Sequence, residues 1–263
     1  MTPAPHRAPT RWIARAALFA ALVAMLPIRT HAETAASDPK AIAIADQVMQ
    51  ALGGKDHWDK LNGLRWTFGA EVNDSIRGTP RRHSWDKMTG WHRVEGKTRA
   101  GQTFCLIHNM NYAKAMAWMD GKPIEGDSLA KLTKMAKSMW TNDTYWFLMP
   151  YKLRDPGVNL KYAGEAKLHG QTYDKLALSF EHVGETPGDR YWVYVNRATH
   201  RVDQWEFVLE GEKPPPELWR WEDWKESGGM WFCTAHRNDK HTNVFTRDVE
   251  VVSQFRPTEF SAP

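Results

Sequence analysis

The sequence predicts an α+β fold in which a curved antiparallel β-sheet, an incomplete barrel, wraps over covering α-helices. Helical periodicity occurs in two separate stretches, residues 39–52 and 127–140, and the segment after each of them alternates polar and apolar residues. The connections between the alternating segments are too short for crossover helices, so neighbouring strands should run antiparallel. An antiparallel sheet of this length twists and curls, which lets helices cover its concave face.

The first 32 residues are typical of a cleavable secretory signal. Three arginines precede an apolar run over residues 16–26, which is far shorter than the roughly 20 residues that a membrane span needs. Residues 30–32, Thr-His-Ala, place small side chains where signal peptidase requires them. We therefore expect cleavage after Ala32, a periplasmic location without a membrane span, and one domain over residues 33–263.

The net charge excludes functions that depend on a basic surface. The formal charge is +4, but the leader contains four arginines and no acidic residue. Removing these from the 35 Lys and Arg residues leaves a number equal to the 31 acidic residues. A neutral mature chain gives no reason to expect a nucleic-acid partner.

The elements of the first half follow from local signals. Asp38-Pro39 is a helix start, with Asp as N-cap and Pro at the first helical position, and the glycine pair at residues 53–54 ends the helix. From Leu64 the apolar period changes to two. We expect strands over residues 64–70, 83–87, 91–95, 103–108 and 115–119. Residues 77–80, Arg-Gly-Thr-Pro, predict a turn.

Helical periodicity returns in the middle of the chain. We expect one helix over residues 127–140 and a second over residues 142–148, ending near Pro150. Alternation then resumes. The expected strands cover residues 175–182, 190–196, 202–209, 219–224, 230–237 and 244–252.

No motif predicts catalysis or metal binding. Nine of the eleven histidines lie outside the leader, but none forms an HExxH motif or pairs with a cysteine at zinc-finger spacing. A GxSxG nucleophile elbow does not occur, and 31 acidic residues offer too many accidental pairs to single out a glycosidase site. We therefore expect a protein that is not an enzyme and that uses no metal and no cofactor.

The two cysteines, Cys105 and Cys233, leave two states open. An even number of cysteines in an oxidising compartment permits one disulfide. Two buried thiols fit the sequence equally well, because a sequence does not supply the Cα separation that a disulfide requires.

Tryptophan is the outstanding feature of the composition. Thirteen of the fourteen tryptophans lie outside the leader, and most fall on expected strands. Core packing explains any one of them, but a one-layer sheet has too few partner layers to bury them all. We therefore expect a concave apolar cavity for an acyl chain, since hiding sixteen carbons from water is worth about 12 kcal/mol. Its predicted ligand-binding residues are Trp66, Phe68, Trp85, Trp91, Phe104, Trp118, Met135, Met139, Trp146, Met149, Trp192, Trp205 and Phe207.

Three segments together resemble a known superfamily. They are the glycine pair before Trp58 and Leu61, residues 142–158 (NDTYWFLMPYKLRDPGV), and residues 188–206, which contain GDRYWVYV. With these segments, residues 40–258 resemble an uncharacterised branch of exported proteins in the LolA/LolB-like superfamily of outer-membrane lipoprotein carriers. The resemblance implies a half-barrel closed by helices, with an apolar cavity for acyl chains.

Together these observations predict a monomeric periplasmic carrier that binds lipid or lipoprotein acyl chains and meets a transient protein partner in the envelope. Other members of the superfamily sense envelope stress, so the alternative is a sensor or interaction protein with the same fold. An envelope hydrolase is the third, less favoured class.

Overall fold

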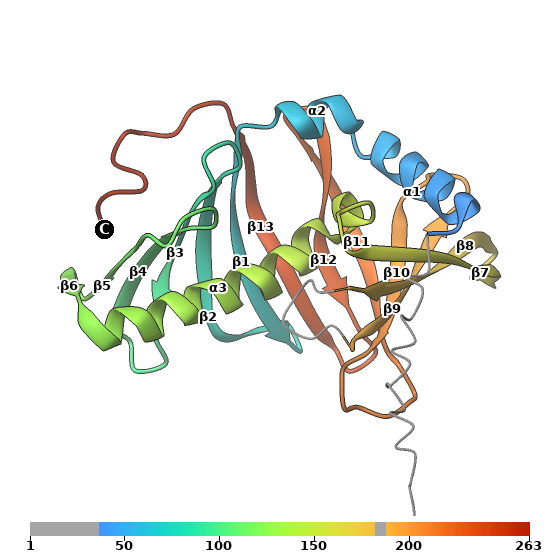
Figure 1. Ribbon diagram of the computed structural model, residues 1–263. Helices are drawn as coiled ribbons and strands as arrows, with labels where there is room; N and C mark the ends of the chain where they lie inside the picture. Colours follow the sequence, from blue (N-terminus) through green and yellow to red (C-terminus); the bar gives the residue numbers. More distant parts are fainter. Residues whose placement is uncertain (1–36, 182–187) are drawn as a thin grey trace, which may run out of the picture. The chain divides into compact units, whose positions relative to one another are not determined.

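The structure is one open sheet with helices packed against it. In the computed structural model, which describes residues 37–181 and 188–263, thirteen strands form a single antiparallel sheet (Figure 1). The strands are β1 (Gly63–Val72), β2 (Ser75–Asp86), β3 (Trp91–Lys97), β4 (Thr103–Asn109), β5 (Ala115–Met119), β6 (Lys122–Ile124), β7 (Val158–Leu168), β8 (Gln171–Phe180), β9 (Arg190–Asn196), β10 (Val202–Val208), β11 (Glu217–Ser227), β12 (Met230–Arg237) and β13 (Thr242–Val252). The predicted leader, its cleavage site after Ala32 and the end of one expected strand at His182 lie outside the described residues.

The strand order explains how two blocks of sequence become one sheet. The order is β6-β5-β4-β3-β2-β1-β13-β12-β11-β10-β9-β8-β7, so each block forms a meander and β1 joins them by pairing with β13. The two edge strands, β6 and β7, do not pair with each other, and the sheet stays open. The predicted α+β class with an antiparallel, incomplete barrel is therefore confirmed.

The helices begin and end largely where the local signals placed them. Helix α1 (Pro39–Ala51) has Asp38 as its N-cap, whose carboxylate accepts a hydrogen bond from the backbone N–H of Lys40 at 2.8 Å. Helix α2 (Lys55–Lys60) is short, and helix α3 (Gly126–Leu148) runs across one face of the sheet (Figure 1). None of the described helices is both long and apolar enough to cross a bilayer.

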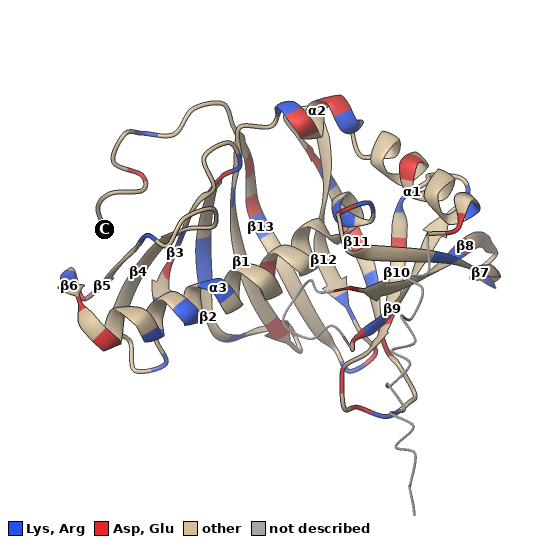
Figure 2. Ribbon diagram, in the orientation of Figure 1, with Lys and Arg blue, Asp and Glu red and all other residues tan. Residues whose placement is uncertain are grey.

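Helix α3 replaces the two helices expected in the middle of the chain. No proline or glycine interrupts residues 127–148, and the side chain of Asn142 donates to Asp143 rather than capping a new helix. The chain leaves α3 through a 3₁₀ turn over Met149–Lys152, which contains Pro150. Beyond Lys137, Asp143 is the one charged residue of α3 (Figure 2).

The turn predicted at residues 77–80 is wrong, because this segment lies inside β2. The chain reverses earlier, at Asn73 and Asp74, which both have the positive φ of a type I′ hairpin. Gly78 also has a positive φ, and it sits where the β1–β2 register shifts between Phe68 and Ala70. The Gly-Thr-Pro signal thus marks a bulge in a long strand.

Two strands were not expected from the sequence, β6 and β7, and both form the edges of the sheet. An edge strand has one neighbour and leaves many of its side chains exposed, so its apolar pattern is weak. In β7 the register with β8 also shifts between Tyr162 and Glu165, where Gly164 has a positive φ.

The core lies between the helices and the helix-covered face of the sheet. One large cluster joins α1, the end of α3 and the central strands, with Leu64, Trp66 and Trp205 among its fully buried residues. A smaller cluster packs the first half of α3 on β3, β4 and β5, around Leu106 and Ala136. The two clusters fix α3 along its length.

Candidate functional site

A cavity of about 660 Å³ lies between the C-terminal half of α3 and the strands of the second meander. This volume is in the range of ligand sites in proteins, roughly 300–1,000 Å³. The largest lining side chains are aromatic: Trp140, Tyr145 and Trp146 of α3, Phe180 of β8, Tyr191 of β9, Trp205 and Phe207 of β10, and Trp219 of β11.

Edge-to-face ring contacts hold the cavity wall in place. The ring of Trp146 lies 4.8 Å from that of Trp205 and 4.9 Å from that of Trp219, both nearly perpendicular. Tyr145 meets Tyr191 in the same way at 5.2 Å. Such pairs stabilise by about 0.5–1.5 kcal/mol beyond the area they bury. The wall is therefore preformed.

The charged groups at the cavity are already engaged. Lys152 forms an ion pair with Asp155, and Glu217 accepts a hydrogen bond from Lys240 at 3.0 Å. The hydroxyl of Tyr145 is buried and has no hydrogen-bond partner among the described residues. A ligand thus meets mainly aromatic rings, without an unpaired cation in the described lining.

Three of the predicted ligand-binding residues, Trp146, Trp205 and Phe207, border this cavity. Trp205 and Phe207 do so together because alternate residues of a strand share a face.

Six further predicted residues are core residues that the cavity does not reach. Trp66, Phe68, Trp85 and Met149 belong to the large cluster, and Phe104 and Met139 belong to or pack on the smaller one. Trp66 is 1% exposed and stacks on His83, with ring centroids 4.6 Å apart. Met135 is exposed instead, because it is rotated by about 100° around α3 from buried Ala136.

The remaining three, Trp91, Trp118 and Trp192, point to the face of the sheet opposite α3. The register pairs Trp118 with Cys105, whereas the neighbouring Ala117 pairs with Leu106 in the small core cluster. Trp192 lies under the ammonium of Lys175, which is 5.7 Å from its ring centroid. A shift of one residue along a strand exchanges its two faces, and the choice of face depends on packing.

The open question about the cysteines is answered against a disulfide. Cys105 is on β4 and Cys233 is on β12, and both are buried free thiols. Four strands lie between β4 and β12, so the cysteines are five strand spacings of about 4.8 Å apart along the sheet. A disulfide needs Cα atoms within about 7 Å.

A chain of buried polar groups between α3 and the first meander was missed from the sequence. Arg81 of β2 donates two hydrogen bonds to Asp143 of α3, at 2.5 and 2.6 Å. His83 Nε2 lies 2.9 Å from the same carboxylate. His83 Nδ1 then contacts His92 Nε2 at 2.9 Å, and His92 Nδ1 contacts His108 Nε2 at 2.9 Å. We call His83, His92 and His108 the imidazole chain.

The imidazole chain is neutral at physiological pH because it is buried. Burial lowers the pKa of His83 and brings that of His92 well below its usual value. Burial and the nearby Lys137 lower the pKa of His108 to about 4. Burial alone would raise the pKa of Asp143, but hydrogen bonds from His83 and Arg81 hold it below its usual value.

A signal for this chain was present in the sequence. Each histidine lies two residues from a buried apolar residue of its own strand, so it occupies a core position. Buried polar groups are normally hydrogen-bonded, and three such histidines on consecutive strands can satisfy one another. Only the strand register shows that they meet.

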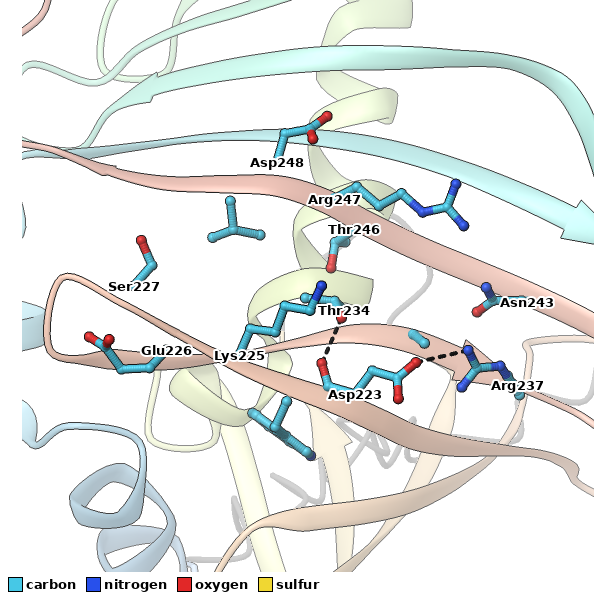
Figure 3. Close-up of a pocket in the computed structure, with 13 residues that line it drawn as sticks. Asp223, Lys225, Glu226, Ser227, Thr234, Arg237, Asn243, Thr246, Arg247 and Asp248 are labelled. Atoms are coloured by element: carbon cyan, nitrogen blue, oxygen red, sulfur yellow. Dashed lines mark hydrogen bonds and ion pairs between the residues drawn. The ribbon is translucent and has the colours of Figure 1, made fainter.

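A second hollow, of about 610 Å³, lies between β11, β12 and β13 (Figure 3). β12 pairs with β13 over three residue pairs, from Ala235 to Arg237, and the strands then separate. Side chains satisfy the groups that line the gap: Thr234 donates to the Asp223 carbonyl, and Arg237 to the Asp223 carboxylate (Figure 3). Charged and polar side chains line this hollow together with Trp224, Ala235 and Val249.

Comparison with solved structures identifies the fold. A LolA superfamily protein from Nitrosomonas europaea superposes with a TM-score of 0.51 at 10% sequence identity, covering 84% of this chain and 97% of that chain. Two more are similar: a DUF1329 family protein from Desulfovibrio piger (TM-score 0.48, 10% identity, 85% and 98% covered) and a domain from Vibrio parahaemolyticus assigned to outer-membrane lipoprotein sorting (0.48, 12%, 84% and 96%). In sequence, no family model matches the chain and no curated protein is significantly similar to it. The LolA-like fold that the sequence resemblance implied is confirmed.

Proposed function

We propose that this protein is a periplasmic, monomeric carrier that holds a lipid or lipoprotein acyl chain in the cavity between α3 and strands β8–β11. The cavity itself carries this assignment: about 660 Å³ of space bounded by the rings of Trp146, Trp205 and Trp219. Burying an acyl chain there is favourable by roughly 0.8 kcal/mol per methylene. Rings already fixed by contacts with one another lose little entropy when the ligand binds.

The chemistry of the lining supports an apolar ligand rather than an anionic one. The lining lysine, Lys152, is paired with Asp155, so no described cation of the cavity is free to neutralise an anionic head group. We propose binding without turnover, because the charged lining groups are held in ion pairs and hydrogen bonds.

The fold and the leader support the carrier role and the location. The LolA superfamily protein from N. europaea has the same sheet-over-helix arrangement. The pattern of residues 1–32 is that of a protein exported across the inner membrane. A carrier in the periplasm needs a covered site, since an acyl chain is insoluble in water.

Titration of delipidated protein with a fluorescent acyl ester tests the proposal. Replacing Trp146 by Leu removes one wall of the cavity and should weaken binding about 10-fold, the equivalent of roughly 1.4 kcal/mol. The matched control is Trp192→Leu on the opposite face, which should leave the affinity unchanged. Folded, delipidated protein that binds no acyl probe would contradict the carrier role. Co-purification with an envelope protein in place of lipid would favour the sensor alternative.

A further inference from the structure

One turn of α3 belongs both to the imidazole chain and to the cavity. Asp143 contacts His83, while residues 144–146 line the cavity. Trp140 does both, because its ring lies 4.8 Å from the ring of His92 and also borders the cavity. Movement of this turn away from the sheet would break the imidazole chain and open the cavity together.

Asp143 orients the hydrogens along the imidazole chain. The Asp143 carboxylate lies 2.9 Å from Nε2 of His83, and the attraction between an anion and an N–H favours the tautomer with the hydrogen on Nε2. Nδ1 of His83 then accepts from Nε2 of His92. By the same rule Nδ1 of His92 accepts from Nε2 of His108. Nδ1 of His108 then carries a lone pair in place of a hydrogen, and this nitrogen is buried without a hydrogen-bond partner among the described residues. It is the nitrogen that can take up a proton, which would place a charge in a buried site beside Lys137.

The surroundings oppose a positive charge on any of the three rings. Arg81 already neutralises Asp143 through two hydrogen bonds. Lys137 of α3 faces His108 and lowers its pKa further. On the other side of the turn, His236 of β12 packs against the ring of Trp146 at 5.4 Å, and burial lowers its pKa to about 4.

We propose that His83, His92 and His108 form an acid-sensitive latch on α3. When neutral they hold residues 140–146 against the sheet, and their protonation releases this turn and opens the cavity. The effect on a ligand rests on the proposed function of the cavity. The latch itself acts in the ligand-free protein.

Acid favours the open state because solvated imidazoles bind protons more tightly than buried ones. A solvated histidine has a pKa of about 6.5, whereas buried His108 is protonated only near pH 4. A histidine that becomes solvated on opening therefore raises the opening equilibrium about 10-fold between pH 7.5 and 5.5. His92 and His108 together raise it about 100-fold.

Hydrogen exchange of the ligand-free protein at pH 7.5 and 5.5 tests the latch. After correction for the intrinsic exchange rate, amides of residues 136–148 should lose about 100-fold in protection, while those of β1 and β13 keep theirs. In His108→Gln, which retains a neutral polar side chain that does not titrate, the loss should shrink to about 10-fold. Equal protection of the wild-type α3 amides at both pH values would overturn the latch, whatever the variants do.

Two further variants separate the latch from general acid destabilisation. His236→Gln removes a buried histidine outside the imidazole chain. Because His236 Nδ1 lies 2.9 Å from the Val244 carbonyl of β13, the sheet holds this ring when α3 moves, and the variant should keep the full loss of protection in α3. If this variant abolishes the loss and His108→Gln does not, the imidazole chain is not the sensor. Asp143→Asn should give weakly protected α3 amides already at pH 7.5, because the anionic end of the chain is gone.

The release rate of a bound fluorescent acyl ester tests whether the latch controls the cavity. From wild-type protein the probe should dissociate about 100-fold faster at pH 5.5 than at pH 7.5 if release follows the opening of α3. Probe release that ignores pH while α3 loses protection would overturn the regulation of the cavity. If the probe binds at neither pH, the proposed function fails, and the exchange result still decides the latch.

Discussion

Helix α3 packs tightly on one half of the sheet and leaves a cavity over the other half. Over β1–β4 the interface is filled: Trp66 is fully buried, and a polar chain ties Asp143 to three strands. Over β8–β11 the rings of the same helix and of the sheet leave a cavity of about 660 Å³. Because one half fixes the helix, the other half can remain open without losing the helix.

The difference also separates two kinds of buried contact. Edge-to-face packing in the cavity half fixes the rings but leaves a space that a ligand can fill. The imidazole chain is directional, since His83 Nδ1 and both ring nitrogens of His92 each have one partner at hydrogen-bond distance, and it therefore sets the position of α3. The predictions below test this division of roles, beginning with the largest effect.

Removing the anion of the filled half should have the largest effect. Asp143→Ala leaves Arg81 part-buried and unpaired, so we expect the free energy of unfolding to fall by about 3–5 kcal/mol in urea denaturation. Asp155→Ala in the cavity half is the matched control, because its ion pair with Lys152 is more exposed and should be worth less than about 1 kcal/mol. Equal losses would erase the distinction between the two halves.

Acid should destabilise both halves, and the half with the imidazole chain more, because it contains three of the four buried histidines among the described residues. His108 and His236, one in each half, have pKa values of about 4 in the folded protein, so below pH 6.5 the unfolded chain binds more protons. Stability is fully present above pH 6.5 and is lost as the pH falls toward 4. Between pH 7.5 and 5.5 we expect a loss of about 1.4 kcal/mol for each of the two.

Urea denaturation across this pH range measures the acid effect. In His236→Gln the free energy of unfolding should fall less between pH 7.5 and 5.5, by about 1.4 kcal/mol, because one titrating histidine is gone. The exposed His169→Gln should leave the pH dependence unaltered, and a change there would point to a different titrating group.

Replacing one tryptophan in each half by leucine should lower the stability more where the site is filled than where it borders the cavity. Trp66→Leu leaves a void in close packing and should lower the free energy of unfolding by about 2 kcal/mol or more. Trp146→Leu enlarges an existing cavity and should lower it by less, while it weakens acyl binding. A larger loss of stability for Trp146 than for Trp66 would mean that the cavity half holds the fold.

Adding a reductant should have the smallest effect on the stability of the protein. Cys105 and Cys233 are five strands apart, so a reductant should leave the melting temperature unchanged, and thiol counting after unfolding should find two free thiols. In the folded protein both should react slowly, because burial raises the pKa of Cys105 to about 11 and that of Cys233 further. A single intramolecular disulfide in protein purified without reductant would contradict the strand order.

Much of the secondary structure was predictable because its causes are local. Asp38 and Pro39 start a helix through their own backbone chemistry, and strict alternation after Leu64 marks a strand wherever one face is buried. The errors have local causes as well. Gly78 provides a bulge rather than a turn, and the edge strand β7 buries little.

The candidate site was predictable only in part, because it depends on which face of each strand meets α3. Trp205 and Trp192 are equally aromatic and both lie on strands, yet one borders the cavity and the other faces away. The sequence shows which residues of a strand share a face, but it does not show which of the two faces the helix covers.

The sequence by itself determined the class of fold, the meanders and an excess of aromatic surface, since alternation, capping and composition act within a few residues. The tertiary structure decided where that surface is filled and where it is hollow. It also decided that His83, His92 and His108, up to 25 positions apart in the chain, touch in a row under Asp143. Strand register and helix docking are sums over many distant contacts, and no single segment contains them.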